Sequence, residues 1–416
     1  MSGHARNLIS LVAIQGSNAG LPLLVFPYAL SVLGAALYAD LVFTEALAFI
    51  VIAVVLYSFE IDGVAEVTGL DPVRQSRQVS RVFSRVLYTR LVLFIAAASL
   101  LVLAIGWYRP ALRELAAWWM LVPLSYALQP TWMFQGLQRN LAPAVCTFVS
   151  RATAVLLVFL LVRGPQDSMR LPQIIGISYV CGSVAMIVWA RVALGLCLLR
   201  VPLAEMMSAL KSGKEIFLGN MGVVLYRDSN VLLLGLIGLA GAELAAYSLA
   251  EKITKAMQAI IRPLNQLFFP RAVLAVRTVG RADRGALTAL RRLTLPQLAA
   301  LTVAWLGLLA SALVGASWFS LRELVAEFDR IVPLAAIMSA ATLFGVCNFM
   351  FGSAGLNILG ERKYMLHAVL AAGGTSVVAT IVLGGSFGAT GAAISLVLAE
   401  GLLFGLIIRR YWRNNG

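Results

Sequence analysis

The side chains best suited to act on another molecule are bases that lie inside long apolar stretches. Arg151, Arg227 and Lys255 each stand near the middle of such a stretch. A charge at the centre of a bilayer costs roughly 2.5 to 3.5 kcal/mol, so all three need partners or water. We therefore expect them to face a hydrated cavity. Its positive charge would attract a phosphate, a pyrophosphate or an acidic sugar.

Helical periodicity places other polar side chains on the same faces as these bases. Lys252, Lys255 and Arg262 share one face of a helix, and Gln15 and Asn18 share a face of the first apolar stretch. Trp132, within QPTWMFQGLQ, could stack on a sugar, although helix packing is the plainer interpretation. The candidate substrate-binding residues are Arg151, Arg227, Lys252, Lys255, Arg262, Gln15, Asn18 and Trp132.

Acidic side chains inside the apolar stretches offer an alternative. Asp228, Glu251, Glu45 and Glu400 could pair with the bases and leave no free charge. Asp228 directly follows Arg227 and points about 100° away from it, so the two are poor partners within one helix. The bases outnumber the acids, which favours an anion-receptive cavity, but structural pairing stays open. Glu45, Asp228 or Glu400 could instead bind a coupling proton or sodium ion.

Composition indicates that membrane-spanning helices position these residues. Of 416 residues, 60% are hydrophobic and 12% charged, with a mean hydropathy of +0.88, which is typical of an all-α polytopic membrane protein. Apolar windows predict about twelve transmembrane helices. They lie near 8–33, 41–59, 86–107, 115–137, 141–162, 174–198, 216–239, 245–270, 293–317, 331–352, 364–384 and 387–408.

Basic residues also predict an orientation. The chain carries a formal charge of +14. Most bases outside the spans fall on one side, and the opposite loops hold only Arg109, Arg113, Arg163, Arg170, Arg322 and Arg330. Positive residues favour the cytoplasmic side, so we expect both termini there. The basic loops are then explained by topology and by contact with anionic membrane lipids, and we expect no nucleic-acid partner.

Few residues suggest an enzyme or a bound cofactor. His4 and His367 stand alone, and the four cysteines lie in apolar stretches without metal-ligand or disulfide spacing. The expected outer loops are short and hold no evident catalytic pair. We therefore expect no metal, no cofactor and no catalytic residue.

The chain also divides near its middle. We predict an N-terminal six-helix bundle over 1–200, a cytoplasmic linker over 201–214 and a C-terminal six-helix bundle over 215–416. A weak internal sequence repeat supports duplication of a six-helix unit. Leu33-Gly34 followed by Asp40 resembles Ile237-Gly238 followed by Glu243.

Four segments resemble bacterial oligosaccharide repeat-unit flippases of the polysaccharide transport family. They are GSNAGLPLLVFPYALSVLG, YSFEIDGVAEV, PTWMFQGLQ and AAYSLAEKITKAMQAIIRPLNQLFFPRA, in the family's order along most of the chain. Three positions depart from the family pattern. Thr131 replaces a common acid, and Glu60 and Asp62 stand where small or amide residues are frequent.

The resemblance implies a fold and a function. The fold would be that of the multidrug, oligosaccharidyl-lipid and polysaccharide exporter superfamily, with two six-helix bundles around a central cavity. The substrate would be an undecaprenyl-diphosphate-linked oligosaccharide, flipped across the bacterial inner membrane for O-antigen or capsular polysaccharide synthesis. Other polysaccharide-assembly membrane proteins would be its partners. A multidrug exporter of the same superfamily, or a membrane-embedded glycan polymerase or ligase, remains an alternative.

Overall fold

The protein is built from helices. The computed structural model describes residues 3–72, 74–280, 283–318 and 327–413, and every regular element within those ranges is helical. The all-α prediction is thus confirmed. The chain divides into two compact units. Unit 1 comprises Met1–Val25 and Val32–Met221, and unit 2 comprises Phe26–Ser31 and Gly222–Gly416.

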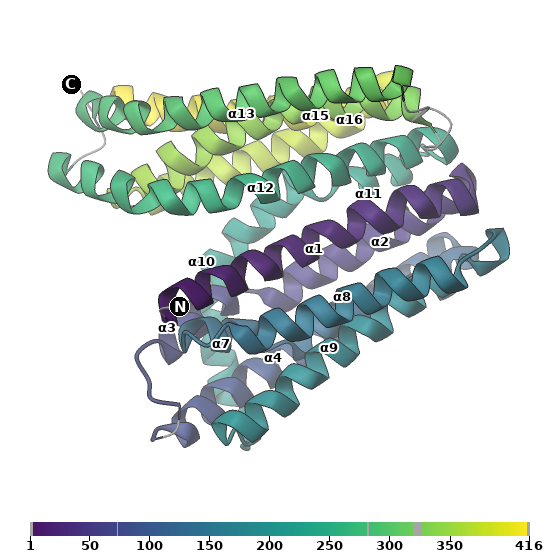
Figure 1. Cartoon of the computed structure of the whole chain (residues 1–416). Helices are drawn as coiled ribbons and strands as arrows, with labels where there is room; N and C mark the ends of the chain where they lie inside the picture. The colour runs from purple at the N-terminus through teal and green to yellow at the C-terminus, as the bar shows by residue number, and fades with distance from the viewer. Residues whose placement is uncertain (1–2, 73, 281–282, 319–326, 414–416) are drawn as a thin grey trace. The chain divides into compact units, whose positions relative to one another are not determined.

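Unit 1 holds the first elements. They are α1 (Gly3–Leu33, apart from its residues in unit 2), α2 (Ala35–Leu56), α3 (Phe59–Val67), α4 (Ser76–Tyr108), η1 (Pro110–Leu112), α5 (Arg113–Trp119), α6 (Leu121–Leu128), α7 (Thr131–Gly136), α8 (Leu141–Leu161), η2 (Pro165–Asp167), α9 (Arg170–Leu194) and most of α10 (Leu203–Arg227). α9 packs on α8 and α6, and α8 and α9 lie side by side in Figure 1. Buried aromatic residues, among them Phe83, Trp132 and Phe134, fill the core where α3, α4 and α7 meet.

Unit 2 holds the remaining elements. They are the end of α10, α11 (Asn230–Leu236), α12 (Gly241–Val279), α13 (Arg284–Trp318), α15 (Phe328–Cys347), the π-helix η3 (Asn348–Leu356) and α16 (Arg362–Arg413). α15 packs against α12 and α16, and the long helices of this unit run alongside one another (Figure 1). A π-helix is rare and often marks a functional position.

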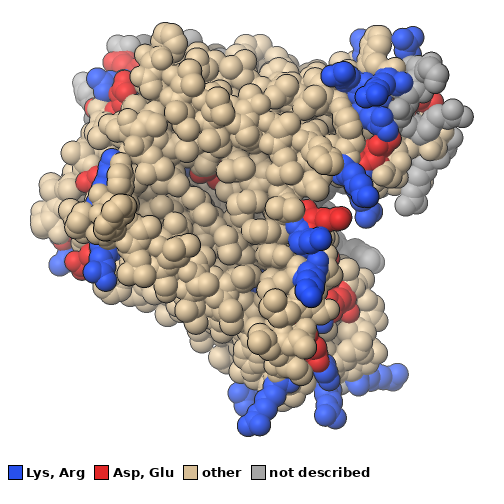
Figure 2. Space-filling model, turned by 180° about the vertical axis from the view of Figure 1, so that it is seen from behind, with Lys and Arg blue, Asp and Glu red and all other residues tan. Residues whose placement is uncertain are grey.

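Seven helices of the described residues are long and apolar enough to cross a membrane. They comprise Ala13–Leu33, Ala35–Val67, Ser76–Tyr108, Leu141–Leu161, Pro165–Leu194, Phe328–Leu356 and Arg362–Arg413. Figure 2 shows charged side chains gathered toward the margins of one face, with a broad and mostly uncharged area between them. Membrane character follows, whereas the number twelve stays a prediction.

Several predicted spans are broken into shorter helices. The span expected over 115–137 consists of α5, α6 and α7. The break between α6 and α7 follows from Pro130, which lacks an N–H and disfavours a helical conformation at Gln129. The span expected over 216–239 breaks between α10 and α11. Most of the expected linker 201–214 is helical, since α10 begins at Leu203. α16 is interrupted by non-helical angles at Gly388, close to the predicted gap between the last two spans.

The two glycines of this short sequence repeat, Gly34 and Gly238, both have a positive φ. Gly34 has φ +78° and precedes α2, and Gly238 has φ +97° shortly before α12. A side chain rarely tolerates such angles, so glycine suits both joints. The short sequence repeat thus corresponds to a positive-φ glycine at a helix junction in each unit.

Candidate functional site

Arg151 is a buried base of unit 1 with neutral partners. It lies on α8 and is 5% exposed. Its Nε donates to Asn18 Oδ1 at 3.1 Å, one Nη donates to Ser150 Oγ at 3.3 Å, and the guanidinium lies over the Tyr179 ring. Among the described residues no carboxylate forms an ion pair with it. The structure therefore brings together Arg151 and Asn18, two of the predicted site residues, without neutralising the charge.

Gln15 belongs to the same helix as Asn18. It is half-buried and lies one turn before Asn18 on α1. Residues three apart share a helix face, so α1 presents two amides on one side. This face supplies hydrogen-bonding groups close to the Arg151 guanidinium.

Unit 2 encloses a cavity of about 430 Å³, within the range of small-molecule sites. Five helices supply its polar lining, with Thr342 contributed by α15. Arg227 comes from the end of α10, Gln258 from α12, Asn348 and Ser353 from η3, and Glu400 from α16. The predicted residues Arg227 and Glu400 thus share one cavity, and Asn348 and Gln258 join them.

Hydrogen bonds fix the polar groups of this cavity. Arg227 donates to the Gln258 side-chain oxygen. Asn348 Nδ2 donates to Glu400 Oε2 at 2.6 Å and to the Glu400 backbone oxygen at 3.1 Å. Within the part of the chain that the structure describes, Arg227 has no ion pair. The cavity therefore holds one cation bound to a neutral amide and one buried carboxylate held by another amide.

Lys255 is neutralised by acids. Its Nζ lies 2.8 Å from Asp228 Oδ1 and 3.3 Å from Glu251 Oε1. Asp228, at the end of α10, thus pairs across to α12 rather than with its neighbour Arg227. For Lys255 the structural-pairing alternative agrees with the geometry.

The other candidates differ in their surroundings. Lys252 is 8% exposed, and its ammonium lies 3.7 Å from the centroid of the Phe26 ring. Glu45 is buried on α2. The side chain of Arg262 lies outside the described residues.

Trp132 is a packing residue in this structure. Its side chain is 1% exposed within the core of unit 1, and its ring lies against Gly63 on α3. No face of the ring is open to a sugar. We therefore leave it out of the candidate site.

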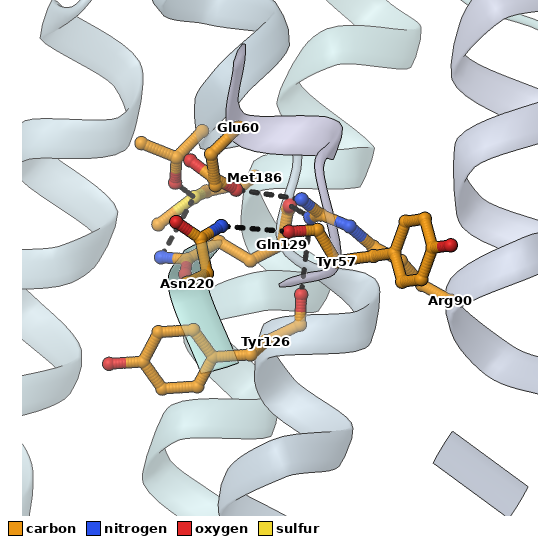
Figure 3. Close-up of polar contacts among 8 residues, drawn as sticks. Tyr57, Glu60, Arg90, Tyr126, Gln129, Met186 and Asn220 are labelled. Carbon is orange, nitrogen blue, oxygen red and sulfur yellow. Dashed lines mark hydrogen bonds and ion pairs between the residues drawn. The ribbon is translucent and has the colours of Figure 1, made fainter. Parts of the chain in front are cut away.

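An ion pair in unit 1 between a buried arginine and an exposed glutamate was not among the sequence candidates (Figure 3). Arg90 is 1% exposed, donates to Glu60 Oε1 at 2.7 Å, and reaches the backbone oxygens of Tyr126 and Gln129 at 3.4 and 3.3 Å. It thereby satisfies carbonyls at the C-terminal end of α6. The signal in the sequence was Glu60, an acid where the resembling family has small or amide residues.

Comparison with known sequences supports the resemblance. The family model described as "Polysaccharide biosynthesis protein" matches residues 4–273. The chain is 24% identical over 427 aligned residues to a protein of Escherichia coli (strain K12) named "Putative O-antigen transporter". That alignment covers 99% of this chain and 97% of the relative.

Two solved structures share the fold. An inward-facing multidrug resistance transporter of the MATE family, in the MOP superfamily, matches with a TM-score of 0.63 and 14% identity, covering 97% of this chain and 98% of that one. The lipid II flippase MurJ, in an inward closed conformation, matches with a TM-score of 0.62 and 14% identity, covering 97% and 87%. At such identity the likeness shows the fold alone.

Proposed function

This chain belongs to the family of polysaccharide biosynthesis proteins, and from that premise we propose that it is a transporter of undecaprenyl-diphosphate-linked oligosaccharide repeat units. It would move them across the bacterial inner membrane for O-antigen or capsular polysaccharide synthesis. The E. coli relative, aligned over nearly its whole length, is named as an O-antigen transporter rather than as an enzyme. This supports transport over the polymerase or ligase alternative.

The observation that carries the proposal is a pair of arginines with neutral partners. Arg151 and Arg227 are each held by amide or hydroxyl groups and have no carboxylate partner among the described residues. A guanidinium keeps its charge when buried and donates in a fork that matches phosphate oxygens. Each unit thus offers one arginine for an anionic substrate, whereas a cationic drug would be repelled.

We propose alternating access as the mechanism, with two bundles, over 1–200 and 215–416, and cytoplasmic termini. Glu400 is the best-placed coupling acid, because it is 3% exposed and lines the same cavity as Arg227. Asp228 is less suited, since Lys255 holds its carboxylate. Anionic lipids at the basic segments and other polysaccharide-assembly proteins are the expected partners.

The test is a leaflet-accessibility assay. The purified full chain is placed in liposomes that carry a fluorescent undecaprenyl-diphosphate oligosaccharide, and the labelled lipid reaching the opposite leaflet is measured over time. We expect Arg151→Gln and Arg227→Gln each to slow transfer at least tenfold, as loss of one charge-assisted hydrogen bond predicts.

Arg191→Gln is the matched control. Arg191 also lies in an apolar helix, α9, but it is exposed and lines no cavity described above. Its variant should transfer substrate at the wild-type rate. Wild-type transfer by both cavity variants would refute the cationic-cavity mechanism, and no transfer by the wild-type protein would refute the function.

A further inference from the structure

A segment of unit 1 between α9 and α10 is fastened to α4 by two buried serines. The backbone N–H of Cys197 donates to Ser80 Oγ at 3.0 Å, and that of Leu199 donates to Ser84 Oγ at 2.9 Å. Ser80 and Ser84 lie one helical turn apart, about 6 Å, and alternate N–H groups of an extended chain have nearly the same separation. The match holds this segment along the first turns of α4, and Arg200 directly follows its second hydrogen-bonded residue, Leu199.

Arg200 contributes to a basic cavity that the proposed transport site does not use. The cavity measures about 600 Å³ and is lined by Gln75, Arg77, Gln78, Arg81, Leu199 and Arg200. Arg81 is held by Glu205 through both Nε and Nη2. Within the described residues, Arg77 and Arg200 have no ion pair. Three arginines and one carboxylate leave a surplus of two positive charges.

The position of this cavity along α4 lies outside the hydrocarbon core of a bilayer. Exposed apolar side chains of α4 extend from Val92 to Tyr108, with Leu100 at their middle. Arg81 precedes Leu100 by 19 residues, or about 29 Å of helix. Half of the hydrocarbon core measures about 15 Å, and half of the bilayer with its headgroups about 20 to 22 Å. Arg81 and Arg77 therefore lie outside the hydrocarbon, at or just beyond the headgroup layer.

We infer that this cavity is a binding site for a lipid-borne phosphate. Arg77 and Arg200 would each donate two hydrogen bonds to phosphate oxygens, Gln75 and Gln78 would add amide donors, and Leu199 would contact the first carbons of the lipid. Two segments that are far apart in the sequence contribute this positive charge, Gln75 to Arg81 and Leu199 to Arg200, and basic clusters beside a membrane attract anionic lipids. This site deepens the proposed function, which names anionic lipids as partners at the basic segments, and its diphosphate source rests on the proposed substrate. A phosphatidylglycerol headgroup and a polyprenyl diphosphate are two sources of the same chemistry.

The experiment measures lipid binding to the full chain by native mass spectrometry in a neutral detergent. Three probes are titrated separately: dioctanoyl phosphatidylglycerol, farnesyl diphosphate and inorganic phosphate. We expect at least one lipid probe to bind the wild-type chain, and the double variant Arg77→Gln/Arg200→Gln to bind it about tenfold more weakly. Arg291→Gln/Arg292→Gln is the matched control. It removes the same charge from two exposed arginines outside the cavity and should bind as the wild type does.

The outcomes separate the sources. Preference for phosphatidylglycerol identifies a membrane lipid, and preference for farnesyl diphosphate identifies the diphosphate of a polyprenyl carrier. Equal binding of inorganic phosphate, or equal weakening by the control variant, overturns the inference. Glu205→Gln removes the competing carboxylate and should tighten binding several-fold, which tests the site without removing an arginine. Transport in liposomes can fail while this binding persists, so the two proposals fail separately.

Discussion

Asn348 donates a hydrogen bond of 2.6 Å to Glu400 Oε2 and joins the first residue of the π-helix η3 to α16 in unit 2. The same amide nitrogen reaches the Glu400 backbone oxygen. Glu400 is 3% exposed, so this amide replaces water around a carboxylate. The contact fixes the wall of the cavity that also holds Arg227.

Asn348→Ala should destabilise the protein by about 1 to 3 kcal/mol, because a buried acceptor loses its donor. Thermal unfolding in detergent would measure the effect. Adding Glu400→Gln removes the charge and should recover part of the loss. Equal unfolding temperatures for Asn348→Ala and the wild type would show that the bond contributes nothing.

Lys255 and Asp228 should behave as a structural pair. We expect Lys255→Met to cost about 1 to 2 kcal/mol, less than a fully buried pair would, since about a third of the Lys255 side chain is exposed. The double variant Lys255→Met/Asp228→Asn should be less destabilised than the two single effects added together. Transport by the folded double variant should stay near wild type, in contrast to Arg227→Gln. Strict additivity of the unfolding energies would contradict the pairing.

Replacing Arg90 should destabilise the protein more than replacing its ion-pair partner Glu60. Arg90 is 1% exposed whereas the Glu60 side chain is 41% exposed, and Arg90 also serves two backbone carbonyls. We expect Arg90→Ala to cost about 2 to 4 kcal/mol and Glu60→Gln less than about 1.5 kcal/mol. Unfolding midpoints of the two variants measure the two losses of stability. A larger loss for Glu60→Gln would contradict the conclusion that Arg90 contributes more to stability than Glu60.

Gly63 and Trp132 test packing against sugar stacking. A Cβ at Gly63 would lie 2.7 Å from Trp132 Cε3, so Gly63→Ala should destabilise by about 1 to 3 kcal/mol. Gly374→Ala is the control, because a Cβ there meets nothing within 4 Å and alanine favours the helix. Trp132→Phe should lower the unfolding temperature without changing transport by the folded protein. A transport defect at full stability would restore the stacking role.

The Arg81 and Glu205 pair should weaken in acid. The hydrogen bond from Arg81 lowers the pKa of Glu205 below its ordinary value of 4.5. Its contribution to stability is therefore present above that ordinary value and is lost as pH falls through the lowered one. The stability difference between wild type and Glu205→Gln should exist at neutral pH and vanish at strongly acidic pH. A difference that grows on acidification would contradict this sign.

Some of the fold was determined by local sequence. Long apolar stretches specify helices and a membrane environment, since backbone groups in lipid must bond within their own helix. The repeat containing Gly34 and Gly238 suggested duplication, and the structure adds that both glycines have a positive φ, a conformation that other residues rarely adopt. The four quoted segments were enough to indicate the family.

Helical periodicity placed each base on a helix face but did not show whether an acidic side chain pairs with it. Arg151, Arg227 and Lys255 look equivalent in the sequence, yet only Lys255 acquires acidic partners among the described residues. Asn348 and Glu400 are 52 residues apart, and no local pattern links them. Side-chain pairing depends on which helices pack together and at what rotation. The sequence by itself therefore determined that charge enters the membrane, and only the tertiary structure decided where that charge stays unpaired.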